Sequence, residues 1–176
     1  GAWFGAQFAG EPVPTYAQAV DFCKANGIWM NVEIKPAPGF EVQTGRIVAE
    51  LTQRLFAAEL DAADHARLPL FSSFSFEAVA AAQAAATGIP RAWLVDTIPA
   101  DWLGRLRTLD AVALHTNHKH LTPALARAVK DAGYGLFCYT VNTPARARAV
   151  LAWGVDAFCT DRIDLFDADA THLAID

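Results

Sequence analysis

The sequence has few cysteines, no excess of positive charge and no long apolar run, and each shortage excludes a class of protein. Its three cysteines, Cys23, Cys138 and Cys159, lie in apolar patterns, which predicts buried free thiols in a reducing compartment. The 19 Asp and Glu outnumber the 14 Lys and Arg, so a basic surface for nucleic acid is not expected. No apolar run reaches the roughly 18 residues of a membrane span, and no signal peptide opens the chain. These observations predict a cytoplasmic protein.

The chain also lacks an initiator methionine. It begins Gly1-Ala2-Trp3-Phe4, which indicates a processed, tagged or partial chain. Its 176 residues, of which 53% are hydrophobic, are enough for one substantial core. We expect a single domain over residues 1–176, with a loop at 1–12, strand–helix units at 13–163 and an acidic tail at 164–176.

Short apolar strands alternate with amphipathic helices from Gly27 onward. The expected strands cover residues 28–35, 68–74, 92–96, 111–117, 135–142 and 155–161. A capping box at Thr15 and Gln18 and the pairs Thr122-Pro123 and Thr143-Pro144 mark helix starts. Strict alternation predicts a parallel sheet with right-handed crossovers, which is either an open doubly wound sheet or part of a closed barrel.

Two observations favour the barrel. A doubly wound nucleotide-binding sheet carries a Gly-rich turn after an early strand, whereas the first strand here ends in Lys35-Pro36-Ala37-Pro38-Gly39. In barrels the functional residues lie at the C-terminal ends of several strands. Polar residues collect at those ends in this chain: Glu33, Lys35, Ser72, Ser73, His115, Asn117, Thr140, Asn142, Thr160 and Asp161.

Glu33 and Lys35 form the most informative pair. Strand alternation places both on one face and sets the apolar residues on the other, namely Ile28, Met30, Val32 and Ile34. An acid and a base at the end of an apolar strand are costly to bury without partners. One interpretation is a structural ion pair or a solvated strand end. The other is a metal-binding carboxylate beside a cation that receives an anionic substrate.

Five segments resemble one known family. They are Asn31-Val32-Glu33-Ile34-Lys35-Pro36, Ser72-Ser73-Phe74, His115-Thr116-Asn117-His118-Lys119, Tyr139-Thr140-Val141-Asn142 (with Tyr where Trp is usual) and Gly154-Val155-Asp156-Ala157-Phe158-Cys159-Thr160-Asp161. Their order and spacing resemble the glycerophosphodiester phosphodiesterases, in particular the short cytoplasmic bacterial type. The resemblance implies a (β/α)₈ TIM barrel of which this chain carries strands three to eight.

The resemblance also implies a chemistry. Family members use a divalent metal, Ca²⁺ or Mg²⁺, and two histidines to release an alcohol from a glycerophosphodiester and leave glycerol 3-phosphate. By this likeness Glu33 is a metal ligand and Lys35 binds the phosphate. A hard cation prefers carboxylate oxygens, which agrees with the first role.

Four further strand-end residues are candidates for binding the phosphate or the rest of the substrate: Ser72, His115, Asn117 and Asn142. His115 and Asn117 share the face of Ala111 and Ala113, which is consistent with lining the barrel. A hydrogen-bonded structural role is an equal alternative, and Ser72 and Asn142 can instead satisfy strand-end backbone groups. The spacing of His115, His118 and His120 also invites a zinc site, but alternation separates His115 from the other two.

The chain departs from the family at its start. No H-R-G occurs in the sequence and no E-x-D precedes Glu33, so both catalytic histidines and two metal carboxylates have no counterpart. A barrel of this class runs to ~250 residues, so roughly 70 residues are missing ahead of Gly1. We therefore expect no catalytic residue within this chain and no activity from it alone.

An alternative function belongs to another class of protein. A truncated, non-catalytic barrel could bind phosphate compounds or assemble with a partner, including another copy of the chain. Six of eight barrel strands would leave two open edges with unpaired backbone groups. We expect the two terminal strands to be unpaired on one side, with Glu33 near the vacant arc, and the isolated chain not to be a stable closed monomer.

Overall fold

The computed structural model describes residues 1–166 and builds them around one parallel sheet. Its six strands are β1 (Asn31–Glu33), β2 (Leu70–Ser73), β3 (Arg91–Val95), β4 (Ala113–Asn117), β5 (Gly135–Tyr139) and β6 (Ala157–Phe158). The helices are α1 (Tyr16–Ala25), α2 (Glu41–Leu55), α3 (Ala57–Asp61), α4 (Phe76–Ala85), α5 (Trp102–Thr108), α6 (Pro123–Asp131) and α7 (Pro144–Ala152). Short 3₁₀ turns cover Ala6–Phe8 (η1), His65–Arg67 (η2) and Ile163–Leu165 (η3).

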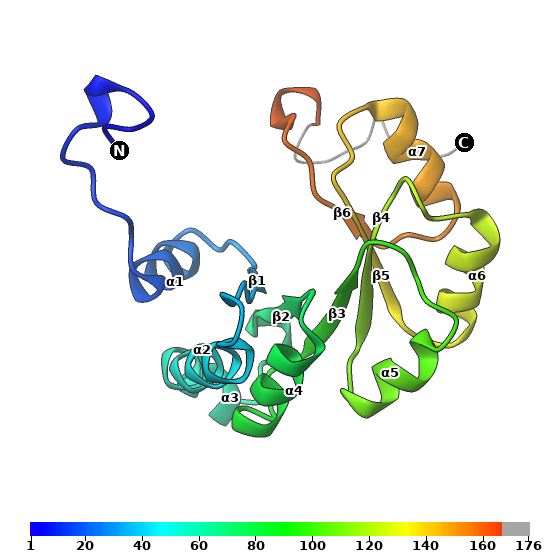
Figure 1. Cartoon of the computed structure of the whole chain (residues 1–176), viewed down its shortest axis with the longest axis horizontal. Coiled ribbons are helices and arrows are strands. Elements are labelled where there is room, and N and C mark those ends of the chain that lie inside the picture. The colour runs from blue at the N-terminus through cyan, green and yellow to red at the C-terminus, as the bar shows by residue number, and fades with distance from the viewer. Residues whose placement is uncertain (167–176) are drawn as a thin grey trace.

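The sheet is a curled half-barrel. Its strands pair in chain order from β1 to β6, all in parallel. Figure 1 shows the sheet curved, with helices on its outer side and η1 standing away from the rest. Within residues 1–166, β1 pairs only with β2 and β6 only with β5, which confirms the two expected open edges. No helix in this part of the chain is long and apolar enough to span a bilayer.

The helix starts follow the caps expected from the sequence. Thr15 accepts a hydrogen bond from the Gln18 amide, and the Gln18 side chain accepts one from the Thr15 amide. Thr122 and Thr143 cap α6 and α7, each followed by proline at the first helical position. These contacts satisfy amide groups that a helix N-terminus leaves without partners, so α1, α6 and α7 each begin at a fixed residue.

The outer face of the sheet carries the core. Trp93, Leu114 and Leu136 pack with Leu106 and Val129 from the covering helices. A second cluster joins β1 and β2 to α1, α2 and α4: its members include Val20, Ile34, Ala49, Phe71, Ala78 and Ala82. Alternation along each strand turns the remaining side chains to the inner face. One row in register across that face is Glu33, Ser72, Ala92, Ala113 and Gly135.

The structure corrects several sequence predictions. Most strands are shorter than expected, and Ile28 lies before β1 with half of its surface exposed, so it does not share the buried face of Ile34. The three cysteines are free, but only Cys138 is fully buried, and Cys159 is exposed where it follows the edge strand β6. The expected tail at 164–176 begins at η3, and residues 167–176 lie outside the described part.

Candidate functional site

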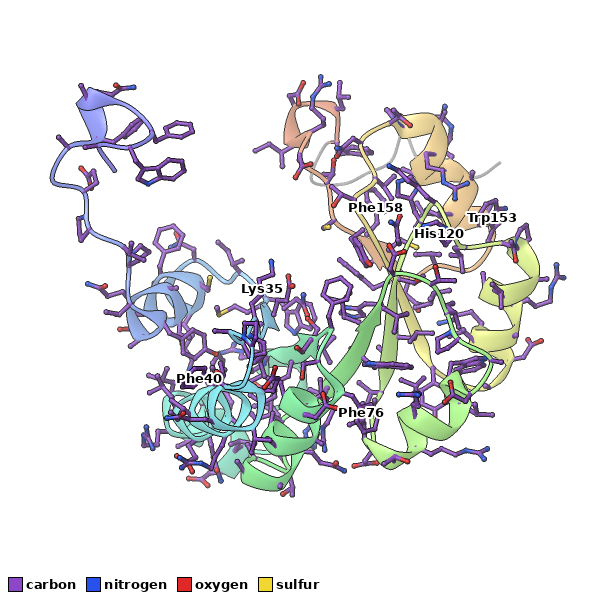
Figure 2. The ribbon with its side chains drawn as sticks, viewed as in Figure 1. Lys35, Phe40, Phe76, His120, Trp153 and Phe158 are labelled. Atoms are coloured by element: carbon purple, nitrogen blue, oxygen red, sulfur yellow. The ribbon has the colours of Figure 1, made fainter. Side chains whose placement is uncertain are left out.

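Glu33 and Lys35 lie on the inner face at the C-terminal end of β1. Ile34 between them is 2% exposed and packs toward the helices, so its neighbours point the other way. Lys35 Nζ lies 3.4 Å from Glu33 Oε1, with the Lys35 side chain 78% exposed and that of Glu33 34% exposed. The two groups thus form the ion pair that one interpretation predicted. Figure 2 shows Lys35 at the end of β1.

This pair borders a small hollow of about 210 Å³, which Ser73 and Phe74 also line. A larger cavity, of about 380 Å³, lies at the opposite end of β1 and is lined by Lys24, Trp29 and Glu59 among others. The smaller hollow is the candidate functional site, because active sites of βα barrels lie at the C-terminal ends of the strands.

The two serines of β2 differ in role. Ser73 Oγ donates a 2.6 Å hydrogen bond to the Ile34 carbonyl and accepts one from the Ser75 amide, so it fastens the end of β1 to β2. Ser72 lies on the inner face in register with Glu33. Its hydroxyl is buried and has no hydrogen-bond partner among residues 1–166. Of the two, Ser72 is the one with an unused polar atom beside Glu33.

Asp96, which follows β3, contacts two polar side chains at the end of β4. Asn117 Nδ2 donates a 2.9 Å hydrogen bond to Asp96 Oδ1, and His120 Nε2 lies 3.3 Å from Asp96 Oδ2. Asn117 Oδ1 accepts a hydrogen bond from the Lys119 amide. Figure 2 shows His120 near the end of β4. Sequence reasoning placed Asp96 at a strand end but missed it as a site residue, although it lies at the end of a buried strand as Asn117 does.

Tyr139 connects three strand ends on the inner face. Its hydroxyl donates a 2.8 Å hydrogen bond to the Val95 carbonyl, and its ring meets that of Phe74 edge-on at 5.8 Å. Burial raises the pKa of Tyr139 to about 12, and the charges of Asp96 and Glu33 add to the rise. The phenol therefore stays protonated at neutral pH and lies within the electrostatic reach of both carboxylates.

His115 lines the inner face, as predicted, but is enclosed. Its side chain is 2% exposed and its ring lies 4.6 Å from that of Phe137, tilted by 37°. Burial lowers the pKa of His115 to about 4. The imidazole is therefore neutral at pH 7 and carries no positive charge for a phosphate.

His118 belongs to a different contact. Arg146 Nε donates a 3.0 Å hydrogen bond to His118 Nδ1, and the same guanidinium donates to the His118 carbonyl. Burial, followed by the charges of Arg146 and Lys119, lowers the pKa of His118. The three histidines of this region do not converge, and the described residues include no group of three or more His, Cys, Asp or Glu suited to a metal.

Asn142 lies at the edge of the sheet, where it fastens β6. Its Oδ1 accepts hydrogen bonds from Thr160 Oγ1 at 3.1 Å and from the Asp161 amide at 2.9 Å. Its Nδ2 donates to Asp161 Oδ2 at 3.1 Å. These contacts agree with the structural alternative for Asn142, in which its side chain satisfies strand-end backbone groups.

The donor set decides how far this chain fits a Ca²⁺ or Mg²⁺ ion. Ca²⁺ takes six to eight oxygen ligands, and Mg²⁺ uses one or two carboxylates together with waters and substrate oxygens. Glu33 offers one exposed carboxylate at the site, and Glu41, whose Oε1 accepts a hydrogen bond from the Gly39 amide, lines the same hollow. The described residues include no group of three or more His, Cys, Asp or Glu suited to a metal, so those present fit part of a coordination shell and not a complete one.

Comparison with known proteins agrees with the fold. YhdW of Bacillus subtilis, named as a candidate glycerophosphodiester phosphodiesterase, is 27% identical over 180 residues, which span 98% of this chain and 68% of that protein. A phosphodiesterase of Oleispira antarctica, solved with the product sn-glycerol-3-phosphate, is 28% identical with a TM-score of 0.76 over 92% of this chain and 62% of that one. A glycerophosphodiester phosphodiesterase of Agrobacterium tumefaciens, 21% identical, shares the fold with a TM-score of 0.69, over 93% of this chain and 65% of that one.

The chain thus spans less than two thirds of the length of these two solved structures. Residues 1–165, which include all six strands, match the sequence pattern of one family. On this match, the chain belongs to the glycerophosphoryl diester phosphodiesterase family.

Proposed function

We propose that the protein containing this chain hydrolyses glycerophosphodiesters, releasing an alcohol and leaving glycerol 3-phosphate. The observation that carries the proposal is the placement of Glu33 and Lys35 side by side on the inner face, at the C-terminal end of β1. The Oleispira relative, which shares this fold, holds sn-glycerol-3-phosphate. A carboxylate and an ammonium at one strand end supply the two kinds of contact that a metal-bound phosphodiester needs.

The two side chains have separate roles in this proposal. Glu33 provides one ligand to a divalent cation, Ca²⁺ or Mg²⁺, and Lys35 contacts an oxygen of the substrate phosphate. The 3.4 Å contact between the two side chains supports this division, because a ligand bound at Glu33 would lie within reach of the Lys35 ammonium. An exposed ion pair contributes only ~0–1 kcal/mol, so the ammonium exchanges the carboxylate for a phosphate oxygen at little cost.

We assign no catalytic acid or base to this chain. His115 is buried and neutral at pH 7, and His118 Nδ1 already accepts a hydrogen bond from Arg146. His120 contacts Asp96, at the end of β3, two strands away from β1. We therefore expect the 176 residues alone to be inactive. The free thiols support a reducing compartment, and a cytoplasmic location is part of the proposal.

The test uses the complete gene product. It is incubated with glycerophosphocholine, glycerophosphoethanolamine and glycerophosphoglycerol, and released glycerol 3-phosphate is measured with a coupled dehydrogenase. We expect release that stops with a chelator and returns with Ca²⁺ or Mg²⁺, while the 176-residue chain releases none. Absence of metal-dependent release from every diester would show the proposed function to be wrong.

A second candidate is a non-catalytic barrel that binds phosphate compounds or a partner. Its motivation is the lack of an H-R-G motif in the sequence and of a carboxylate–histidine cluster among residues 1–166. It predicts that the complete protein binds glycerol 3-phosphate, measured by calorimetry, without turning over any diester. In the version of this candidate that binds a partner, copies of the chain associate through the edges of β1 and β6. Light scattering would detect this association as an increase in molar mass.

A further inference from the structure

Phe74, Tyr139 and Asp96 form a group that the proposed hydrolysis does not use, called here the aromatic–acid cluster. Phe74 follows β2, Tyr139 ends β5 and Asp96 follows β3, so three separate strands bring these residues together. Phe74 is 51% exposed and the Asp96 side chain 63% exposed, while Tyr139 is partly buried. A ligand can therefore reach the cluster at the same strand ends as Glu33.

The geometry of the cluster is held by hydrogen bonds. Tyr139 Oη donates to the carbonyl of Val95, the residue directly before Asp96, at 2.8 Å. This bond sets the phenol ring beside the end of β3, and its edge-on contact at 5.8 Å holds the Phe74 ring next to it. Asn117 Nδ2 fixes one oxygen of Asp96 at 2.9 Å. These contacts hold the two rings together at the end of β3, where Asp96 follows and is held by Asn117.

Asp96 differs from most of the acidic side chains that form ion pairs within residues 1–166. Glu50, Glu59, Asp101, Asp156 and Asp164 each lie against a Lys or Arg. Within residues 1–166, Asp96 contacts no Lys or Arg, and its side-chain partners are Asn117, Thr97 and His120. The amide and the hydroxyl leave its charge uncompensated, and His120 compensates it only while the imidazole is protonated.

The cluster has the chemistry of a site for an organic cation. Aromatic rings present a negative face that attracts ammonium groups, and quaternary ammonium ligands are bound in this way. A carboxylate beside the rings adds direct charge attraction. The charges of Asp96 and Glu33 both act on Tyr139 and, after burial, help to raise its pKa, which places a negative field at the rings.

Resting on the proposed function, we propose that Phe74, Tyr139 and Asp96 bind the cationic alcohol portion of the substrate, a quaternary or primary ammonium group. The cluster then selects diesters with a cationic head group over those with a neutral one. Glu33 and Lys35 act on the phosphate, while the aromatic–acid cluster acts on the leaving alcohol.

The first experiment measures selectivity in the complete protein. The ratio of kcat/KM for glycerophosphocholine to that for glycerophosphoglycerol is determined for wild type and for Asp96→Asn, which keeps an oxygen for the Asn117 amide. A cation–π and charge contact corresponds to a ratio change of roughly five- to thirtyfold. We expect this drop for Asp96→Asn and a comparable one for Phe74→Leu. The matched control is Asp101→Asn, a surface carboxylate paired with Arg105, which should leave the ratio unchanged.

The outcomes distinguish this inference from the proposed function. Turnover of both diesters with no wild-type preference, or an equal loss on both substrates in Asp96→Asn, overturns the cluster's role and leaves the hydrolase intact. Absence of turnover on every diester refutes the hydrolase instead. In that case saturation-transfer NMR with choline tests the cluster directly. Binding that Asp96→Asn weakens supports it, and binding that is absent or unaffected by the variant overturns it.

Discussion

The central strands and the β1 edge show what a parallel strand needs in order to be buried. All five residues of β3 are buried, because β2 and β4 flank it and helices cover its outer face. β1 has three residues, of which Asn31 and Glu33 are exposed and Val32 is partly buried. Ile28 and Trp29 ahead of it are also exposed. Pairing on both sides, more than sequence hydrophobicity, separates the two regions.

The same contrast divides the functional residues. Asp96, Asn117 and Tyr139 lie at the ends of strands that are paired on both sides. Glu33 and Lys35 lie at the end of an edge strand, which is held by the Ser73 bond to the Ile34 carbonyl and by pairing with β2. The position of Glu33 and Lys35, which we propose bind the metal and the phosphate, therefore depends on what packs against β1, whereas the position of the aromatic–acid cluster does not.

The largest effect is expected at the edge pair. In the complete protein, Glu33→Gln should reduce turnover by roughly a hundredfold or more and weaken metal binding, since it removes a charged ligand. Lys35→Ala should raise KM or lower kcat while metal binding persists, because in the proposal Lys35 contacts the phosphate and not the metal. Steady-state kinetics and metal titration by calorimetry measure both.

Glu50→Gln is the control for this pair, since Glu50 is an exposed carboxylate on α2 paired with Arg46. It should change neither turnover nor metal affinity. Equal losses in metal affinity for Glu33→Gln and Lys35→Ala would contradict the division of roles and indicate that the ion pair has a structural task only.

A core substitution should show how much more the centre contributes to stability than the edge. Leu114 is fully buried in β4, and Leu114→Ala should lower the free energy of unfolding by about 2–5 kcal/mol. Ile28 is 50% exposed, so Ile28→Ala should lower the free energy of unfolding by at most about 1 kcal/mol. Urea unfolding of the complete protein measures both. A loss at Ile28 as large as at Leu114 would show that the edge is as well packed as the centre there.

His115 should make stability depend on pH. Its folded-state pKa of about 4 lies below the ordinary value of 6.5, so the unfolded chain binds the proton more readily. The stability that the buried neutral imidazole contributes is fully present above pH ~6.5. It is lost as pH falls toward ~4, by up to about 3 kcal/mol. We expect His115→Leu to flatten the slope of unfolding free energy in that window, while His65→Ala, at an exposed residue, leaves it. An unchanged slope in His115→Leu would refute the buried neutral imidazole.

The helix caps should give the smallest difference. Thr122→Ala removes the cap of α6, whose Ala126 and Val129 are fully buried, and should cost about 1 kcal/mol of global stability. Thr15→Ala removes the cap of α1, which has only Val20 fully buried, so it should mainly increase hydrogen exchange of the first turn. A larger global loss for Thr15→Ala would reverse the ranking of the two regions.

Much of the fold could be predicted from local sequence. The six strands and the helix caps follow from the strand–helix alternation and the end signals, whereas the two unpaired edges follow from the family resemblance, which implied six of eight barrel strands. The inner-face placement of Glu33, His115 and Asn117 follows from the two-residue period of a strand. Strand lengths do not follow, because ladder hydrogen bonds depend on neighbours, and β6 pairs over two residues where seven were expected.

The rest of the candidate site depends on contacts between distant residues. The Tyr139–Val95 hydrogen bond joins positions 44 residues apart, and the Asn117–Asp96 bond joins positions 21 apart. Sequence indicated a polar residue at each strand end but not which ends meet. Asn142 shows the same limit, because its pattern suited substrate binding, whereas its hydrogen bonds go to Thr160 and Asp161.

Cys138 and Cys159 differ in exposure, so labelling of their thiols can report on the edge of the sheet at β6. Burial raises the pKa of Cys138 to about 12, so this thiol resists alkylation at neutral pH. Cys159 is exposed and directly follows the edge strand β6, with its amide bonded to the Cys138 carbonyl. Any strand, helix or second copy that covers this edge would shield Cys159. Its labelling rate therefore measures how often the edge is covered in solution.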